Sequence, residues 1–193
     1  MTRTRAVATN APVGAGLRRF LVLAVAFAWL AIACDVPRES TAFKGGPAPA
    51  FEITAFNKEF ADRAFSLEQL RGQIIVLNFW ASWCPECEHE MPAFEEAWRR
   101  YRDQGVWFIG VDYMDFDEEA LAMLERYQIT YPNGPDRGTE ISKRYRVTGV
   151  PETIFIDRNG IVQEVHLGPV SRARVKQVIE QMLSQPSGEA PGA

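Results

Sequence analysis

The sequence predicts an α/β fold with a mixed central β-sheet flanked by helices on both faces. Two apolar runs without charged residues, 73–79 and 106–111, are each followed by a helical periodicity, which is typical of buried parallel strands joined by crossover helices. An Asn159-Gly160 pair lies between two further strand-like runs, and this dipeptide favours an antiparallel hairpin. With 193 residues, 47% of them hydrophobic, the chain is long enough for one domain with a substantial core.

The first half of a domain at 51–184 begins with a half-buried strand. Apolar and polar residues alternate at 51–56, and Ser66 and Gln69 have the spacing of a capping box, which predicts a short helix at 66–70. After the strand at 73–79, apolar residues recur in steps of three and four and predict a long helix that ends at Gly105. Its buried face is expected to consist of Cys87, Met91, Phe94, Trp98 and Tyr101.

The second half continues with a buried strand at 106–111. Asp117 is expected to cap a helix at 118–127, with Ala120, Leu121, Leu124 and Tyr127 facing the core. Residues 131–135 read as a loop, and Thr139 is expected to cap a short helix that ends near Tyr145. Strands at 153–157 and 161–167 form the hairpin. Ser171 begins the last helix, whose buried face is expected to consist of Val175, Val178, Ile179 and Met182. Residues 185–193 are expected to be a disordered tail.

Residues 1–34 have the pattern of an export leader. Arg18 and Arg19 precede an uncharged apolar run at 20–33, which is shorter than the roughly 20 residues of a membrane-spanning helix. The run ends in Ala31-Ile32-Ala33-Cys34, which resembles the lipobox of bacterial lipoproteins and makes Cys34 a lipidation candidate. An uncleaved membrane anchor and an ordinary cleaved signal are the alternatives. All three place the domain on the extracytoplasmic side.

Charge is unevenly distributed along the chain. The formal net charge is −4, but residues 1–38 carry five arginines and one aspartate, so the rest carries −8. A positive leader before an acidic domain fits export, whereas a nucleic-acid-binding protein needs a basic surface, and we expect no nucleic-acid partner. Residues 35–50 contain three prolines, two glycines and few bulky apolar side chains, which predicts a flexible linker.

Cys84 and Cys87 lie two residues apart between the strand at 73–79 and the helix that follows. Backbone N–H groups at a helix start concentrate positive charge and stabilise a thiolate on the first cysteine, and the second lies close enough to form a disulfide with it. Pro85 suits the first helical turn, where its missing N–H costs nothing. Glu86 adds a negative charge that opposes the helix dipole, which predicts a reducing rather than a strongly oxidising pair.

The chain resembles the membrane-tethered thiol–disulfide oxidoreductases of the TlpA, ResA and CcmG (DsbE) group, within the thioredoxin superfamily. The resemblance covers residues 47–183 and rests on the motifs at 76–87, 90–92, 149–153 and 157–160. It implies a thioredoxin-like fold. It also implies a cis-proline loop at Val150-Pro151 that lies against the active-site sulfurs.

The resemblance suggests roles for individual residues. Cys84 is expected to be the partly exposed nucleophile and Cys87 the buried resolving thiol. Thioredoxins carry a buried Asp where this chain has Asn78, so Asp115, which matches an acidic position of the ResA-like and CcmG-like proteins, is the expected acid–base group. Asp112 and Asp117 compete for that role. Catalytic Pro151 and the substrate-binding residues complete the site: Trp83, Pro85, Glu86, Val150 and Glu152.

The cysteine pair also has other interpretations. A structural disulfide is natural in an exported domain, and His89 could join both cysteines in a metal site, although no fourth ligand is evident. Residues 51–79 also resemble peroxiredoxins, but neither cysteine lies in the Thr-x-x-Cys pattern of a peroxidatic cysteine. His166 is assigned no role.

The expected function is that of an extracytoplasmic, membrane-tethered reductase of protein disulfides. The leading substrates are the haem-site cysteines of apocytochrome c. A membrane electron donor is expected to re-reduce the pair, so no bound cofactor is needed. The protein is expected to be monomeric. A general thiol reductant and a copper-site metallochaperone reductase are alternatives within the class. A non-enzymatic metal-binding or structural domain is the alternative from another class.

Overall fold

A computed structural model describes residues 38–39 and 44–185 of the chain. The expected leader at 1–34 with Cys34, the linker residues 35–37 and 40–43, and the tail at 186–193 lie outside these residues. Within the described part, no helix is long and apolar enough to cross a membrane.

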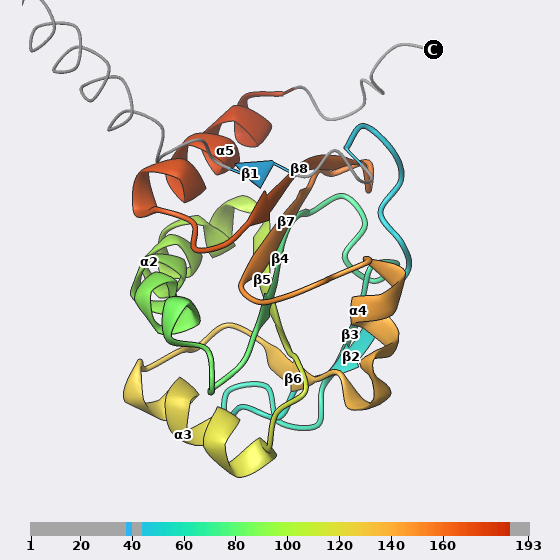
Figure 1. Ribbon diagram of the computed structural model, residues 1–193. Coiled ribbons are helices and arrows are strands. Elements are labelled where there is room, and N and C mark those ends of the chain that lie inside the picture. The colour runs from blue at the N-terminus through green and yellow to red at the C-terminus, as the bar shows by residue number, and fades with distance from the viewer. Residues whose placement is uncertain (1–37, 40–43, 186–193) are drawn as a thin grey trace, which may run out of the picture. The chain divides into compact units, whose positions relative to one another are not determined.

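The centre of the described domain is a six-stranded mixed sheet with the order β1-β8-β7-β4-β5-β6 (Figure 1). β4 pairs in parallel with β5 and antiparallel with β7, and β7 forms the predicted hairpin with β8. Every residue of β4 is buried, as its unbroken apolar run predicts. The strands are β1 (Arg38–Glu39), β4 (Ile74–Trp80), β5 (Val106–Asp112), β6 (Asn133–Pro135), β7 (Glu152–Ile156) and β8 (Val162–Leu167).

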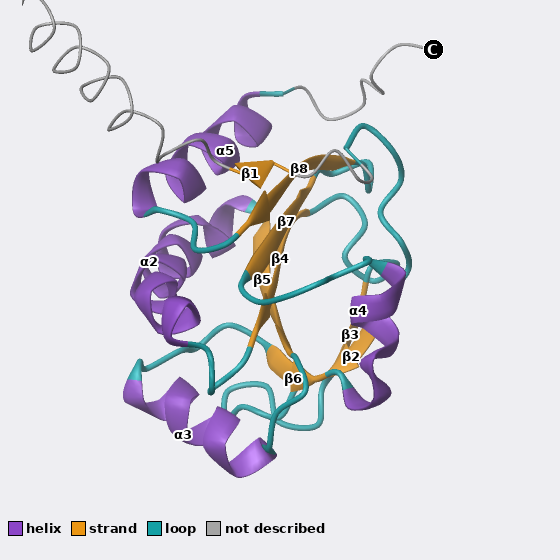
Figure 2. Cartoon of the chain, in the orientation of Figure 1, coloured by secondary structure: helices purple, strands orange, loops and turns teal. Residues whose placement is uncertain are grey.

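Helices cover both faces of this sheet, which confirms the predicted α/β class (Figure 2). On one face lie α2 (Pro85–Tyr101), α3 (Asp117–Arg126) and α5 (Arg172–Ser184). On the other lie α4 (Glu140–Arg144) and a two-stranded sheet of β2 (Glu52–Thr54) and β3 (Ala64–Ser66). The 3-10 helices η1 (Arg102–Gln104) and η2 (Arg137–Thr139) complete the described elements.

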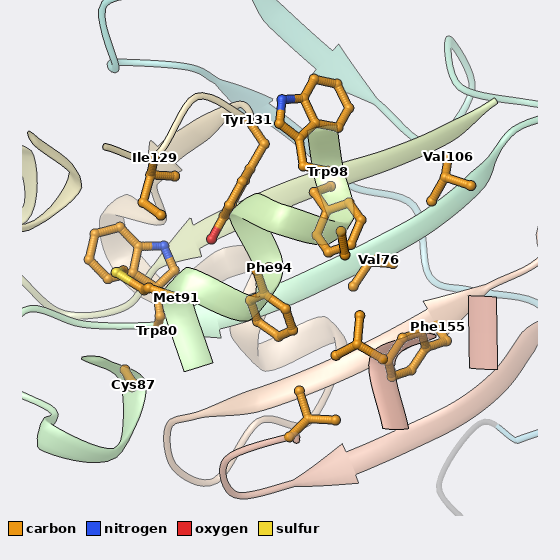
Figure 3. Packing of buried hydrophobic residues seen from close by; sticks show 14 of the residues in the cluster. Val76, Trp80, Cys87, Met91, Phe94, Trp98, Val106, Ile129, Tyr131 and Phe155 are labelled. Carbon is orange, nitrogen blue, oxygen red and sulfur yellow. The ribbon is translucent and has the colours of Figure 1, made fainter. Parts of the chain in front are cut away.

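The core under α2 positions the cysteine pair. The predicted apolar faces of α2 and α5 are buried throughout, and they pack on β4, β5 and β7. Together they form one hydrophobic cluster. Figure 3 shows Phe94 and Tyr131 in this cluster, with Cys87 at one side of it. Cys87 is therefore anchored by the same hydrophobic face that anchors the helix.

The N-terminal elements are smaller than predicted. The strand expected at 51–56 is reduced to β2, and it pairs with the unpredicted β3 rather than with the central sheet. The capping box is present, with Ser66 N donating to Gln69 Oε1 at 3.1 Å and Gln69 N to Ser66 Oγ at 3.2 Å. The helix at 66–70 is nevertheless a turn, because Gly72 at a positive φ of 82° redirects the chain into β4.

Four predictions for the segment 116–145 are also wrong in detail. The loop expected at 131–135 contains β6, which pairs in parallel with the free edge of β5. Helix α3 has Phe116 rather than Asp117 at its N-cap. Ala120 and Leu124 are buried and Tyr127 packs against the core, as predicted, but Leu121 is exposed and Met123 is the further buried residue.

The cap of α4 is likewise different. Thr139 makes no capping bond with its side chain, because the Asp136 carboxylate instead accepts from Ile141 N and Ser142 N at 3.0 and 2.8 Å.

The flexible linker expected at 35–50 is wrong for residues 44–50. Gly45 N donates to Val162 O and Ala48 N to Gly160 O, both at 2.8 Å, and Val162 N donates to Gly46 O at 3.0 Å. This segment pairs with backbone N–H and C=O groups at the beginning of β8. Residues 44–50 therefore belong to the domain.

Gly110→Ala is expected to destabilise the protein, because a Cβ at this position would overlap the Asn133 amide oxygen and lie 2.9 Å from Trp80 Nε1. Overpacking of this kind costs about 1–3 kcal/mol, which urea denaturation would measure. Gly149→Ala is the matched control, since nothing lies within 4 Å of its added Cβ. Equal stability of the two variants would contradict this view of the β5–β6 contact.

Candidate active site

Cys84 and Cys87 form a disulfide at the N-terminus of α2, with Cα atoms 5.4 Å apart. Cys84 is the N-cap residue and Pro85 the first helical residue. Cys87 N donates to Cys84 Sγ at 3.2 Å, so the sulfur takes the place of the oxygen that usually accepts at an N-cap. The predicted strand, cysteine pair and helix start are thus all in place.

The exposure of Cys84 differs from the prediction. Its residue is only 4% exposed in the disulfide form, and Cys87 is fully buried. The Cys84 side chain folds back over the first turn to accept from Cys87 N. Trp83, by contrast, is 56% exposed. It is therefore more accessible to solvent than either cysteine.

The Val150-Pro151 peptide bond is cis. Pro151 is buried and Val150 is half-buried against the core. Glu152 follows as the first residue of β7 and pairs with Phe79 on β4. This register brings the proline loop to the end of β4 from which the chain enters the cysteine loop.

Asp115 lies against the cysteine loop. Its carboxylate accepts from Ser82 N, from Ser82 Oγ at 2.9 Å and from Phe116 N at 2.8 Å. The structure therefore brings Asp115 close to the site, as the sequence predicts, in contacts that fix the loop before Cys84. Of its two competitors, Asp117 pairs with Arg137 at 2.5 Å, and Asp112 is buried.

Glu90 is a buried acid to which the sequence reasoning gave no role. It is 2% exposed, and its carboxyl accepts from Asn78 Nδ2 at 2.8 Å and from Val170 N at 2.9 Å. Burial raises the pKa of Glu90 to about 8, although the hydrogen bonds from Val170 and Asn78 lower it. The available signal was its place between Cys87 and Met91 on the apolar face of α2, where a charged residue is unusual.

Burial raises the pKa of two further acids near the site. Burial, followed by the nearby charge of Asp115, raises the pKa of Asp112 to about 8. Burial alone raises the pKa of Glu152 to about 7. Glu86 differs from both, since its side chain is exposed and lies 3.5 Å from His89 Nδ1.

Comparison with known proteins agrees with this geometry. The model of the AhpC/TSA family matches residues 45–165. The chain belongs to this family. It is 26% identical over 166 residues to the thiol-disulfide oxidoreductase ResA of Oceanobacillus iheyensis, covering 86% of each chain. It is 30% identical over 142 residues to ResA of Bacillus thuringiensis subsp. konkukian, covering 73% of this chain and 77% of that one.

Solved structures show the same relationship. A putative thiol:disulfide interchange protein DsbE from Chlorobium tepidum superposes with a TM-score of 0.66 at 26% identity, covering 73% of this chain and 98% of that one. The fold is therefore thioredoxin-like. With the Cys84–Cys87 pair in place, the chain is a thiol–disulfide oxidoreductase of the ResA/DsbE type.

Glu90→Gln is expected to weaken the pH dependence of stability. Burial raises the pKa of Glu90 from 4.5 to about 8, so between these values the folded state binds a proton that the unfolded state has released. The free energy of unfolding therefore falls as pH rises through this window. The variant should lose this contribution, on the order of a few kcal/mol, in urea denaturation from about pH 5 to 8.

Exposed Glu68→Gln serves as the control, with the wild-type slope expected. A Glu90→Gln variant that keeps the wild-type slope would show that Glu90 is ionised in the folded protein at neutral pH.

Proposed function

We propose that this oxidoreductase is a membrane-tethered reductase on the extracytoplasmic side. The observation that carries the proposal is the Cys84–Cys87 pair at the start of α2, beside the cis-proline loop and buried acids. The leader pattern at 1–34 supports export and tethering. The proposed substrates are disulfides formed by the cysteines of exported proteins, and the leading candidates are those of apocytochrome c. The proposed active form is a monomer.

The reduced pair acts in two steps. The Cys84 thiolate attacks one sulfur of a substrate disulfide, forms a mixed disulfide and releases the other substrate sulfur as a thiolate that takes a proton. Cys87 then loses its proton and attacks Cys84 Sγ, which releases the second substrate thiol and leaves the disulfide described above. A membrane donor returns two electrons to the pair, so the reaction needs no bound cofactor.

The proton of Cys87 needs a buried partner, because Cys87 has no access to water. Glu90 lies one helical turn later, on the same face of α2. Its raised pKa suits exchange of a proton near neutral pH. Asp115 was the expected acid–base group, but its three accepted hydrogen bonds favour a role in holding the loop at Ser82.

The substrate chain is proposed to lie between Trp83 and the cis-proline loop. Trp83 is exposed beside the disulfide, and the Val150 backbone precedes the buried Pro151. Pro85, Glu86 and Glu152 complete the lining that we propose for this groove.

Glu86→Gln is expected to make the redox potential of the pair less negative, because it removes a negative charge that opposes thiolate formation at Cys84. Glu86 is exposed and lies near His89, so the shift should be only roughly 10 mV. Equilibration with glutathione would measure it, with Glu140→Gln on α4 as the control. An unchanged or more negative potential would refute this role of Glu86.

Cys87→Ser is expected to trap substrates as mixed disulfides with Cys84, since the resolving thiol is missing. Non-reducing electrophoresis of the full chain in membranes, followed by mass spectrometry, would identify them. The Cys84→Ser, Cys87→Ser double variant is the control and should capture nothing.

The captured proteins separate the alternatives. Capture without any cytochrome would remove the leading substrate and favour a general thiol or copper-site reductase. No capture, together with stoichiometric zinc binding by the wild type, would instead favour a metal-binding domain.

A further inference from the structure

A pocket of about 440 Å³ opens between the end of β5, the start of α3 and the loop before α4. Its lining includes Asp112, Met114, Asp115, Phe116, Asp136 and Arg137. Three of these six side chains are acidic and two are apolar. Trp83 and the cis-proline loop are not part of this lining, so the pocket is distinct from the substrate groove proposed above.

Asp112 is the unusual member of this lining. It is 2% exposed, and neither of its carboxylate oxygens has a hydrogen-bond partner within the described part of the chain. An unpaired buried carboxyl costs free energy, and such groups call for an explanation. Besides burial, the neighbours that act on the pKa of Asp112 are Asp115, through its charge and its side chain, and Asp117 and Arg137, through their charges. All three lie at or beside the pocket.

The other charged groups around the pocket already have partners. Asp136 accepts from the first turn of α4, and Asp115 accepts from Ser82. Arg137 is held by Asp117 at 2.5 Å. Within the described lining, the buried side-chain acceptors without a hydrogen-bond partner are the two oxygens of Asp112, so the pocket offers a place for a cation.

One wall of the pocket is shared with the cysteine loop. Trp83 Nε1 donates to Met114 O at 3.1 Å, and Tyr113 N donates to Trp80 O at 2.8 Å. Met114 is 65% exposed and Phe116 76% exposed. Apolar surface therefore leads from the residue before Cys84 to the mouth of the pocket.

We propose that this pocket is a substrate subsite for a cationic side chain, lysine or arginine, close in sequence to the cysteine that Cys84 attacks. The stem of that side chain lies on Met114 and Phe116, as long basic side chains cover apolar surface, and its head donates to Asp112. The subsite rests on the proposed reductase function, because it takes a substrate whose sulfur is already at Cys84.

The test compares two peptides that differ only next to their single cysteine, with lysine or norleucine there. Each cysteine is supplied as its mixed disulfide with thionitrobenzoate. The Cys84 thiolate of the reduced full chain attacks the peptide sulfur, and the thionitrobenzoate thiolate leaves with the bonding electrons and is detected by its colour. The wild type should react with the lysine peptide about tenfold faster at low peptide concentration, the effect of one hydrogen bond to a charged group.

Three variants locate the preference. Asp112→Asn should bring the ratio of the two rates close to one, and Arg137→Gln should raise the ratio by removing the positive charge at the pocket. Asp103→Asn, an exposed acid in η1, should keep the wild-type ratio. Because Arg137 is also exposed, its variant provides a test even where Asp112→Asn does not fold.

Equal rates for the two peptides with the wild type overturn the subsite and leave the reductase function intact. An unchanged preference in folded Asp112→Asn, or a lowered one in Arg137→Gln, also overturns it. Absence of release from both peptides overturns the reductase function itself, and the subsite with it.

Discussion

The hydrogen bond between the Asn78 amide and the Glu90 carboxyl is the contact on which the arrangement of the site depends. It joins the central strand β4 to the helix that carries both cysteines. Asn78 also donates to Thr153 on β7 at 3.1 Å, and Glu90 accepts from the Val170 backbone before α5. All three side chains are buried, so their bonds strengthen in the low dielectric and offset the cost of removing them from water. The cysteine helix, the strand after the cis-proline and α5 are thus placed relative to one another by one polar network inside the core.

Elements that are encoded by neighbouring residues could be predicted from the sequence. The hairpin follows from Asn159-Gly160, and α2 and α5 follow from apolar residues at helical spacing. β3 and β6 could not be predicted, because three residues are too few to show a period and each strand forms only where a distant strand offers hydrogen bonds. The turn at 66–70 shows that a local motif can also predict an element that does not form. Its capping box is fully formed, yet a cap stabilises a helix only where the chain continues as one.

The site divides in the same way. The positions of Cys84 and Cys87 follow from a motif that the sequence shows directly, and the cis-proline loop follows from the resemblance to a known family. The environments of the acids do not, because burial is a property of the assembled core. Asp112 ends a strand and would be solvated there, but β6 and the residues after it cover the strand end. Asn78 replaces the buried acid of the central strand, and the structure supplies an acid from the facing helix instead, at Glu90.

The position of the buried acid on α2, rather than on β4, affects the cysteine pair. While Glu90 holds its proton, it carries no charge that could oppose the Cys84 thiolate, which the helix N-terminus stabilises. Above a pH of about 8 Glu90 ionises, and its charge then works against the thiolate in a medium that screens poorly. Linkage makes the effect mutual, since a thiolate in the pair raises the pKa of Glu90 in turn. Exposed Glu86 lies in water beside His89 and acts more weakly. We therefore expect the buried carboxyl, rather than the exposed one, to couple proton uptake to reduction of the pair.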